Sequence, residues 1–159
     1  MTGNEHNEFG FVSVDKTNRL RMMSKRMKKI EHAMADLPKG NLFGGRDAKI
    51  GIIGFGSTYG PILESMDQLA NKGISTRFHQ IRTIFPLLED DLNEFTEPME
   101  RVFVVESNYQ GQLAAMLRSA IKDKEKLESI TKFDGAAFKP KEIAGAIQSV
   151  LKGGHVLEA

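Results

Sequence analysis

The 159-residue sequence contains no cysteine. Without cysteine, the chain itself has no disulfide bond, thiolate zinc site, cysteine-ligated iron–sulfur cluster or cysteine nucleophile. The sequence also has no apolar run of the length that a membrane span requires. Residues 1–10, MTGNEHNEFG, show neither the basic nor the apolar region of a signal peptide. These absences predict a cytoplasmic protein with no membrane partner.

Recognisable catalytic groups are scarce as well. None of the four histidines, His6, His32, His79 and His155, has a second metal-ligating residue at a suitable spacing. Ser57 lies in G-S-T-Y-G, whose glycines do not match the G-x-S-x-G of a nucleophile elbow. The sequence therefore predicts no catalytic residue and no metal ligand in this chain.

The charges nearly balance, and the net charge of +1 gives the whole chain no electrostatic bias toward nucleic acid. Seven lysine and arginine residues nevertheless lie between Lys16 and Lys29 with no acid among them, whereas residues 87–100 are rich in Asp and Glu. No aromatic residues are interleaved with these cations. The basic stretch therefore predicts a solvated face or a docking surface for an acidic partner, and no nucleic-acid partner.

Residues 17–36 follow a helical pattern. Apolar residues recur at steps of three and four, which predicts one stripe that packs against a core. The stripe consists of Leu20, Met23, Met27, Ile30, Met34 and Leu37. Asp15 or Thr17 is the candidate N-terminal cap. The glycine-rich residues 38–47 that follow predict a linker.

Short apolar segments then alternate with helical patterns. Strands are predicted over residues 49–55, 74–81, 101–106 and 127–133. Helices are predicted over residues 61–72, 87–99 and 109–124, and a last helix begins at Pro140. This alternation predicts an α/β fold, with a mostly parallel, open, three-layer sheet and helices on both faces. The predicted domains are a connector with a basic amphipathic helix, residues 1–46, and an α/β domain, residues 47–159.

The first candidate site is the turn after the first strand of the α/β domain, in GIIGFGSTYG. A dinucleotide-binding loop has the spacing G-x-G-x-x-G, whereas Gly54, Gly56 and Gly60 are spaced G-x-G-x-x-x-G. No lysine follows these glycines, as a P-loop requires, and the second strand ends without an acidic residue. We therefore expect the glycines to form a tight turn, with Ser57 or Thr58 as the helix cap.

The second candidate site is the turn after the third strand, in VVESNYQGQL. Its candidate binding or interface residues are Glu106, Asn108, Tyr109 and Gln112. Ligands of open parallel sheets bind at the carboxyl ends of strands, so we expect this turn and the Gly54–Thr58 turn to face one crevice. Three interpretations remain open: a ligand site, a protein–protein contact, or a structural turn in which Ser107 or Asn108 caps the helix. In the structural turn, the dipole of the helix stabilises the negative charge of Glu106. Tyr109 is then a packing residue.

Taken together, these segments resemble the alpha subunits of 2-oxoacid:ferredoxin oxidoreductases, in the 2-oxoglutarate-type branch. Residues 2–31 resemble the segment that joins the pyrimidine-binding domain to the next domain, and the rest resembles the transketolase C-terminal-like domain. The first part is carried by Thr2, Gly3, Glu5, His6, Glu8, Gly10, Asn18, Arg19, Lys25, Arg26 and Met27. The second part is carried by Gly54, Phe55, Gly56, Ser57, Thr58, Gly60, Phe85, Pro86, Val104, Val105, Glu106, Asn108, Tyr109, Gly111, Gln112, Leu113, Phe133, Asp134, Gly135, Phe138 and Pro140.

The resemblance implies a complex that oxidatively decarboxylates a 2-oxoacid with coenzyme A and passes electrons to ferredoxin. It implies thiamine diphosphate, Mg²⁺ and iron–sulfur clusters as cofactors of the whole complex. The implied partners are the remaining alpha-subunit region, the beta subunit, a gamma subunit where one exists, and ferredoxin through the complex.

The chain departs from a full subunit, because the Tyr-Pro-Ile-Thr-Pro-type motif of the thiamine-contacting region is missing. The diphosphate-binding module of the beta subunit is missing too. We therefore expect a non-catalytic assembly piece that itself binds none of these cofactors and is a candidate for homo-oligomer formation. The alternative is a stand-alone α/β domain that binds a nucleotide or another small ligand through its Gly54–Thr58 loop.

Overall fold

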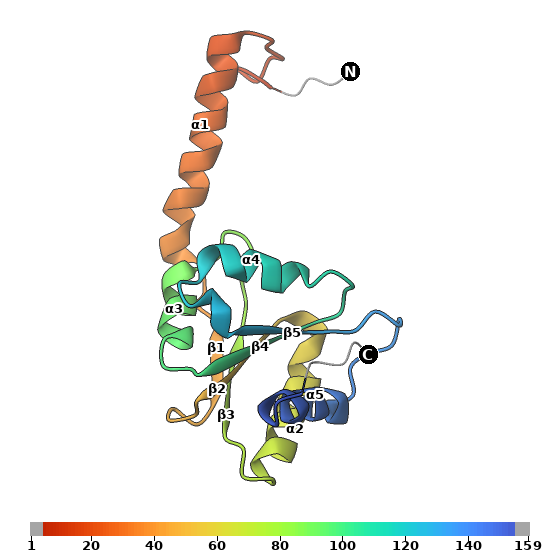
Figure 1. Ribbon diagram of the computed structural model, residues 1–159. Helices are drawn as coiled ribbons and strands as arrows, with labels where there is room; N and C mark the ends of the chain where they lie inside the picture. The colour runs from red at the N-terminus through yellow and green to blue at the C-terminus, as the bar shows by residue number, and fades with distance from the viewer. Residues whose placement is uncertain (1–4, 155–159) are drawn as a thin grey trace. The chain divides into compact units, whose positions relative to one another are not determined.

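The structure is a computed structural model that describes residues 5–154. The chain divides into two compact units, Met1–Leu37 and Pro38–Ala159, and Figure 1 labels the elements of each. Thr2, Gly3 and His155, which the sequence analysis names, lie outside the described residues. None of the helices within residues 5–154 is long and apolar enough to cross a membrane.

The first unit consists of one helix and the chain segment before it. Helix α1 (Lys16–Ala33) continues into a 3₁₀ turn, η1 (Met34–Asp36). The helix begins near its predicted start because the Asp15 carboxylate accepts a hydrogen bond from the Asn18 backbone N–H at 2.6 Å. Before the helix, His6 and Val12 form an isolated antiparallel bridge.

The second unit contains a five-stranded sheet with the order β1-β3-β2-β4-β5. Its strands are β1 (Asn41–Gly44), β2 (Ile50–Gly54), β3 (Thr76–Gln80), β4 (Arg101–Glu106) and β5 (Leu127–Thr131). The last four strands are parallel to one another, and β1 is an antiparallel edge strand that pairs with β3. The prediction of a mostly parallel α/β sheet is therefore confirmed.

Helices cover both faces of this sheet (Figure 1). The helices are α2 (Tyr59–Ala70), α3 (Glu89–Thr96), α4 (Gln112–Ala120) and α5 (Pro140–Leu151). Ile52 and Phe103 pack with α2 and α5 on one face, whereas Ile53 and Val104 pack with α3 and α4 on the other. Because alternate residues of a strand point to opposite faces, one apolar strand serves two cores. The predicted three-layer arrangement is confirmed.

The predicted linker over residues 38–47 is wrong, because this segment contains β1. Asn41 pairs with Gln80 at the far end of β3, and the two side chains share a hydrogen bond of 2.9 Å. β1 is short and exposed along most of its length, so it shows no apolar alternation in the sequence. Its identity as a strand depends on pairing with a segment distant in the sequence.

The helix predicted over residues 109–124 is wrong at both ends. The chain turns through residues 107–111 before α4 begins at Gln112. After α4, Ile121 has an extended backbone and a buried side chain, and the Lys122 N–H donates to the Asn93 side chain at 2.9 Å. The helical periodicity therefore continues in the sequence after the helix itself has ended.

Candidate functional site

The two predicted turns lie at the same edge of the sheet, where the parallel strands β2 and β4 reach their carboxyl ends. Strands β2 and β4 are parallel neighbours, with Gly54 of β2 opposite Val105 of β4. The turn after β2 and the turn after β4 therefore begin at the same level along the sheet. This placement agrees with the expectation from strand order in open parallel sheets.

In the first turn, Gly54 is required by close packing. A Cβ atom at Gly54 would lie 2.5 Å from Ile62 Cδ1 and 2.8 Å from Thr58 Oγ1, so any other residue would force these side chains to shift. The strand and the helix that follows it consequently approach each other closely. This role needs no bound phosphate, and it agrees with the tight-turn interpretation.

The remainder of this turn is the 3₁₀ segment η2 (Gly56–Thr58). Gly56 has a φ of 58°, in the left-handed region that favours glycine. Ser57 is exposed, and the Thr58 hydroxyl donates to the Phe55 carbonyl at 2.9 Å. Thr58 is the N-cap residue of α2, as predicted, but its side chain makes no capping hydrogen bond to the helix. The helix instead continues directly from the 3₁₀ turn.

In the second turn, the Glu106 side chain is completely buried at the end of β4. One carboxylate oxygen accepts the Leu113 backbone N–H at 2.7 Å, and the other accepts the Ala114 N–H at 2.9 Å. The first N–H groups of a helix have no partner within the helix, and a negative charge is favourable beside them. Glu106 therefore caps α4 from inside the protein.

Asn108 completes the turn. Its side-chain N–H donates to Glu106 Oε2 at 2.5 Å, and its Oδ1 atom accepts from the Gly111 and Gln112 N–H groups at 2.7 and 3.1 Å. Both polar ends of Asn108 are thus used within the turn. The hydrogen bonds of Glu106 and Asn108 fit the structural interpretation of this segment.

The residues that the turn presents outward are aromatic and polar. Tyr109 is 71% exposed, and its ring meets that of Phe133 edge-to-face, with centroids 4.8 Å apart. Gln112 is exposed at the first position of α4. Phe133 is not among the predicted site residues. Its place near the turn after β4 could have been inferred from the pairing of β4 with β5, because this pairing puts the loops after the two strands side by side.

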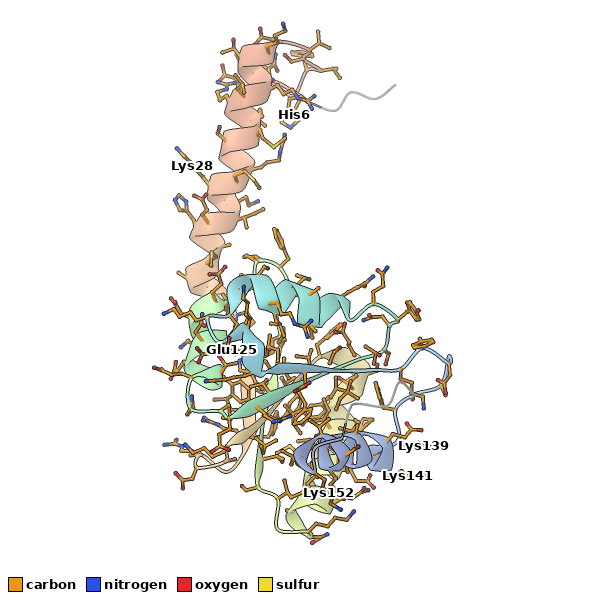
Figure 2. All side chains as sticks on the ribbon, in the orientation of Figure 1. His6, Lys28, Glu125, Lys139, Lys141 and Lys152 are labelled. Atoms are coloured by element: carbon orange, nitrogen blue, oxygen red, sulfur yellow. The ribbon has the colours of Figure 1, made fainter. Side chains whose placement is uncertain are left out.

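An ionic cluster around a buried lysine beside this edge was also missed. Lys132, 4% exposed, contacts both oxygens of Glu142 at 3.0 and 2.9 Å and Asp134 at 3.5 Å, and it lies over the Phe138 ring. The hydrogen bond to Glu142 raises the pKa of Lys132. The Lys139 backbone N–H and then Lys132 lower the pKa of the Glu142 carboxyl. Because the charges are paired, this cluster ties the end of β5 to α5; Figure 2 labels Lys139 at that end of α5.

The second unit also contains a buried His–Asp pair. His79 Nε2 lies 2.8 Å from Asp91 Oδ2, and the same oxygen accepts the Gly40 N–H at 2.9 Å. The adjoining cavity has a volume of about 10 Å³, which is room for about one water molecule and no substrate. The pair therefore connects β3, α3 and the segment before β1 as a structural contact.

The described residues do not fit the cofactors that the family resemblance implies. Within residues 5–154, no group of three His, Cys, Asp or Glu residues is placed to hold a metal ion. The sequence has no cysteine for an iron–sulfur cluster. Glu106 and Asn108 already bind each other and backbone N–H groups at the start of α4.

Comparison with known proteins identifies the family. Residues 48–143 match the family model of pyruvate:ferredoxin oxidoreductase core domain II. The chain belongs to this family. The chain is also 38% identical, over 158 residues, to the alpha subunit of 2-oxoacid:ferredoxin oxidoreductase 2 of Aeropyrum pernix. That match covers 98% of this chain and 24% of the relative.

Solved structures agree with the core domain II assignment. A 2-oxoglutarate:ferredoxin oxidoreductase from Magnetococcus marinus, with 2-oxoglutarate, coenzyme A and succinyl-CoA bound, has a TM-score of 0.79 at 29% identity. It covers 92% of this chain, which in turn covers 26% of that one. A split gene transketolase, described as an inactive beta4 tetramer, shares the fold with a TM-score of 0.55 at 16% identity. That match covers 72% of this chain and 41% of the other. The resemblance and the transketolase-like fold predicted from the sequence are confirmed. The chain spans about a quarter of the length of its alpha-subunit relatives.

Proposed function

We propose that this chain acts as an assembly domain within the alpha subunit of a 2-oxoacid:ferredoxin oxidoreductase and supplies no reacting group. The observation that carries the proposal is the match to an alpha subunit along 98% of the chain. The internal use of Glu106 and Asn108 supports the non-catalytic role, because these polar groups stabilise a helix and not a ligand.

The whole complex then couples decarboxylation of a 2-oxoacid, with formation of an acyl-CoA, to reduction of ferredoxin. We favour a 2-oxoglutarate-type substrate, because the similar Magnetococcus marinus enzyme is described with 2-oxoglutarate, coenzyme A and succinyl-CoA bound. In this proposal the other regions of the complex hold thiamine diphosphate, Mg²⁺ and the iron–sulfur clusters. A cytoplasmic location agrees with the cysteine-free composition.

The proposed interface on the second unit is the edge formed by the two turns. The residues assigned to it are Gly54, Gly56, Ser57, Thr58, Glu106, Asn108, Tyr109 and Gln112. Within this set, Glu106 and Asn108 hold the turn in shape, and Tyr109 supplies exposed aromatic area. Tyrosine is enriched among the residues that dominate binding energy at protein interfaces. Tyr109, supported by Phe133, is therefore the proposed central contact.

Reconstitution tests the assembly role. The rest of the alpha subunit and the beta subunit of the source organism are purified with and without this chain, followed by size-exclusion chromatography and an assay of viologen reduction with 2-oxoglutarate and coenzyme A. We expect a complex and activity only when the chain is added, and no activity from the chain alone. Failure of the wild-type chain to associate contradicts the proposal. So does tight binding of NAD(P), ATP or coenzyme A to the isolated chain in calorimetry, which supports a stand-alone ligand-binding domain.

A pair of variants tests the edge of the second unit as an interface. Tyr109→Ala removes the exposed ring, whereas Lys141→Ala changes an exposed residue at the start of α5, labelled in Figure 2. We expect Tyr109→Ala to weaken association at least tenfold, a typical cost for truncating a central interface aromatic. Lys141→Ala is expected to bind like the wild type. Equal binding by both variants contradicts the assignment of this edge.

A further inference from the structure

The described part of the first unit, residues 5–37, has no buried apolar side chain. Among residues 5–37, the only buried side chains are those of Glu5 and Asn18, both of them polar. Met22, Ile30 and Leu37 are half-buried, and the other large apolar side chains among residues 5–37 are exposed. The exposed ones are Phe9, Phe11, Val12, Val14, Leu20, Met23, Met27 and Met34. This distribution is the reverse of that in an independently folded domain.

Polar contacts hold the first unit together. The Glu5 carboxylate binds the Arg26 guanidinium through two hydrogen bonds of 3.0 and 2.7 Å, which connect the start of the segment to the middle of α1. Asn18 donates to the His6 carbonyl at 2.9 Å. Hydrogen bonds from Arg26 lower the pKa of the Glu5 carboxyl. These contacts fix the segment before α1 against the helix.

The exposed apolar residues of α1 and of the 3₁₀ turn η1 that follows it lie on one side of the helix, and the half-buried Ile30 lies between two of them. Leu20, Met23, Met27 and Met34 are spaced by three, four and seven residues, which places them on one side of a helix. We call these four residues the α1 stripe. The four are between 39% and 71% exposed. An apolar surface of this length marks an interaction site, and flexible methionines adapt well to a partner.

A cationic surface lies on the other side of α1. Arg21, Lys25 and Lys28 line one groove together with Lys29 and His32, and Figure 2 shows Lys28 projecting outward from the helix. The helix is therefore amphipathic, with its polar face charged positively. A complementary partner offers an apolar groove with carboxylates along its rim.

The comparisons point to the occupant of the α1 stripe. The alpha subunit of Aeropyrum pernix matches 98% of this chain, and therefore includes a counterpart of the first unit, but the match covers only 24% of that subunit. About three quarters of such a subunit thus lie outside the region that this chain represents. That additional polypeptide is present wherever the counterpart of α1 is present.

We infer that the α1 stripe docks into an apolar, acid-rimmed groove on the part of the alpha subunit that this chain does not contain. The inference rests on the proposed function, and it names the surface of the first unit that takes part in assembly. The apolar face provides the contact area, and the cations of the opposite face act at longer range on the acidic rim. In proteins most of the stability of a helix comes from packing of its apolar face, so docking also stabilises α1.

Two double variants test the inference. Met23→Gln/Met27→Gln removes apolar area from the α1 stripe, and Lys25→Gln/Lys28→Gln is the matched change on the cationic face. Gln, Met and Lys have similar helix propensities, so helicity, checked by circular dichroism, stays unchanged. The probe is the remaining alpha-subunit polypeptide of the source organism, expressed separately, and its affinity is measured by calorimetry at low and high salt.

We expect the methionine variant to bind at least tenfold more weakly at both salt concentrations. The lysine variant is expected to lose affinity mainly at low salt, because salt screens exposed charges. Wild-type affinity in the methionine variant overturns the inference and leaves the proposed function intact. Failure of the wild-type chain to bind the probe overturns the proposed function as well. Self-association of the chain that the methionine variant abolishes also overturns the inference, because a second copy then occupies the stripe.

Discussion

The two units of the chain place apolar and polar residues in opposite ways. In the second unit, two apolar clusters fill the two faces of the sheet, and strand residues such as Phe103 and Val104 are fully buried. In the described part of the first unit, the buried residues are polar and the apolar residues face outward. Both units contain amphipathic helices, but only the second supplies the surface against which they pack.

This difference separates two sources of stability. Burial of apolar area stabilises the second unit within the chain itself, at about 25 cal/mol per Å² removed from water. The first unit relies on a few hydrogen bonds and ion pairs, whose net contribution is small when their groups are exposed. The comparison predicts that the same type of substitution has very different effects in the two units.

The largest difference is expected from truncating one apolar side chain in each unit. Phe103→Ala removes a fully buried ring and is expected to lower the free energy of unfolding by about 3–5 kcal/mol. Leu20→Ala, at a residue 71% exposed, is expected to change it by no more than about 0.5 kcal/mol. Both tyrosines lie in the second unit, so urea denaturation followed by tyrosine fluorescence measures the first effect and circular dichroism the second. If Leu20→Ala lowers the free energy of unfolding nearly as much as Phe103→Ala does, the proposed contrast between the two units is wrong.

Glu106→Ala tests the polar contact that the second unit buries most deeply. The substitution leaves the Leu113 and Ala114 N–H groups without their acceptor, and unsatisfied buried donors are costly. We expect a loss of about 2–4 kcal/mol in the free energy of unfolding. Glu106→Gln, which retains one acceptor oxygen, is expected to lose less. Thermal and urea denaturation of both variants measure the effect, and a neutral Glu106→Ala variant contradicts the capping role.

How far the sequence predicts this fold depends on how local each signal is. The strand over residues 101–106 has its predicted bounds, because a continuous apolar run followed by Glu106 is a local pattern. β1 was missed because it forms only by pairing with β3. The end of α4 was missed because Ile121 keeps the apolar spacing of the helix but leaves it with an extended backbone.

The candidate sites show the same limit. The dipole interpretation of Glu106 follows from its position before a helix, whereas its full burial and its link to Asn108 follow from the packed sheet. The periodicity of α1 predicts an apolar stripe but not the molecule that covers it. The expectation that the stripe packs in a core is not met within residues 5–37, where Leu20 is among the most exposed residues.

Lys132→Met tests a smaller contribution, that of the ionic cluster beside α5. The pKa of the Glu142 carboxyl lies below its ordinary value of 4.5, so its ion pair stabilises the fold above that pH and is lost as the pH falls through the lowered pKa. We therefore expect Lys132→Met to be less stable than the wild type at pH 7 and the difference to shrink as the pH falls through the lowered pKa of Glu142, below 4.5. Lys141→Met, an exposed control, is expected to show no such pH dependence. If the difference in the free energy of unfolding between Lys132→Met and the wild type stays constant with pH, the loss of stability comes from lost packing over Phe138.

The smallest effect is expected from Glu5→Gln, because it acts on a unit with little intrinsic stability. The carboxylate contacts Arg26 through two short hydrogen bonds, and the neutral amide keeps neither the charge nor both acceptors. We expect faster hydrogen exchange of the α1 amides and unchanged exchange in β2 and β4. Because the pKa of Glu5 is lowered, the wild type should match the variant only as the pH falls through that lowered value, below 4.5.

Glu8→Gln is the matched control for this effect. Glu8 and Arg21 are 3.7 Å apart and both are more than half exposed, so their ion pair contributes little. Equal exchange in the two variants shows that the Glu5–Arg26 contact does not order the first unit. If Glu5→Gln alone loosens α1, then polar contacts hold the α1 stripe in a helical form before any partner covers it. The partner then binds a surface that is already formed, and the cost of ordering the helix does not reduce its affinity.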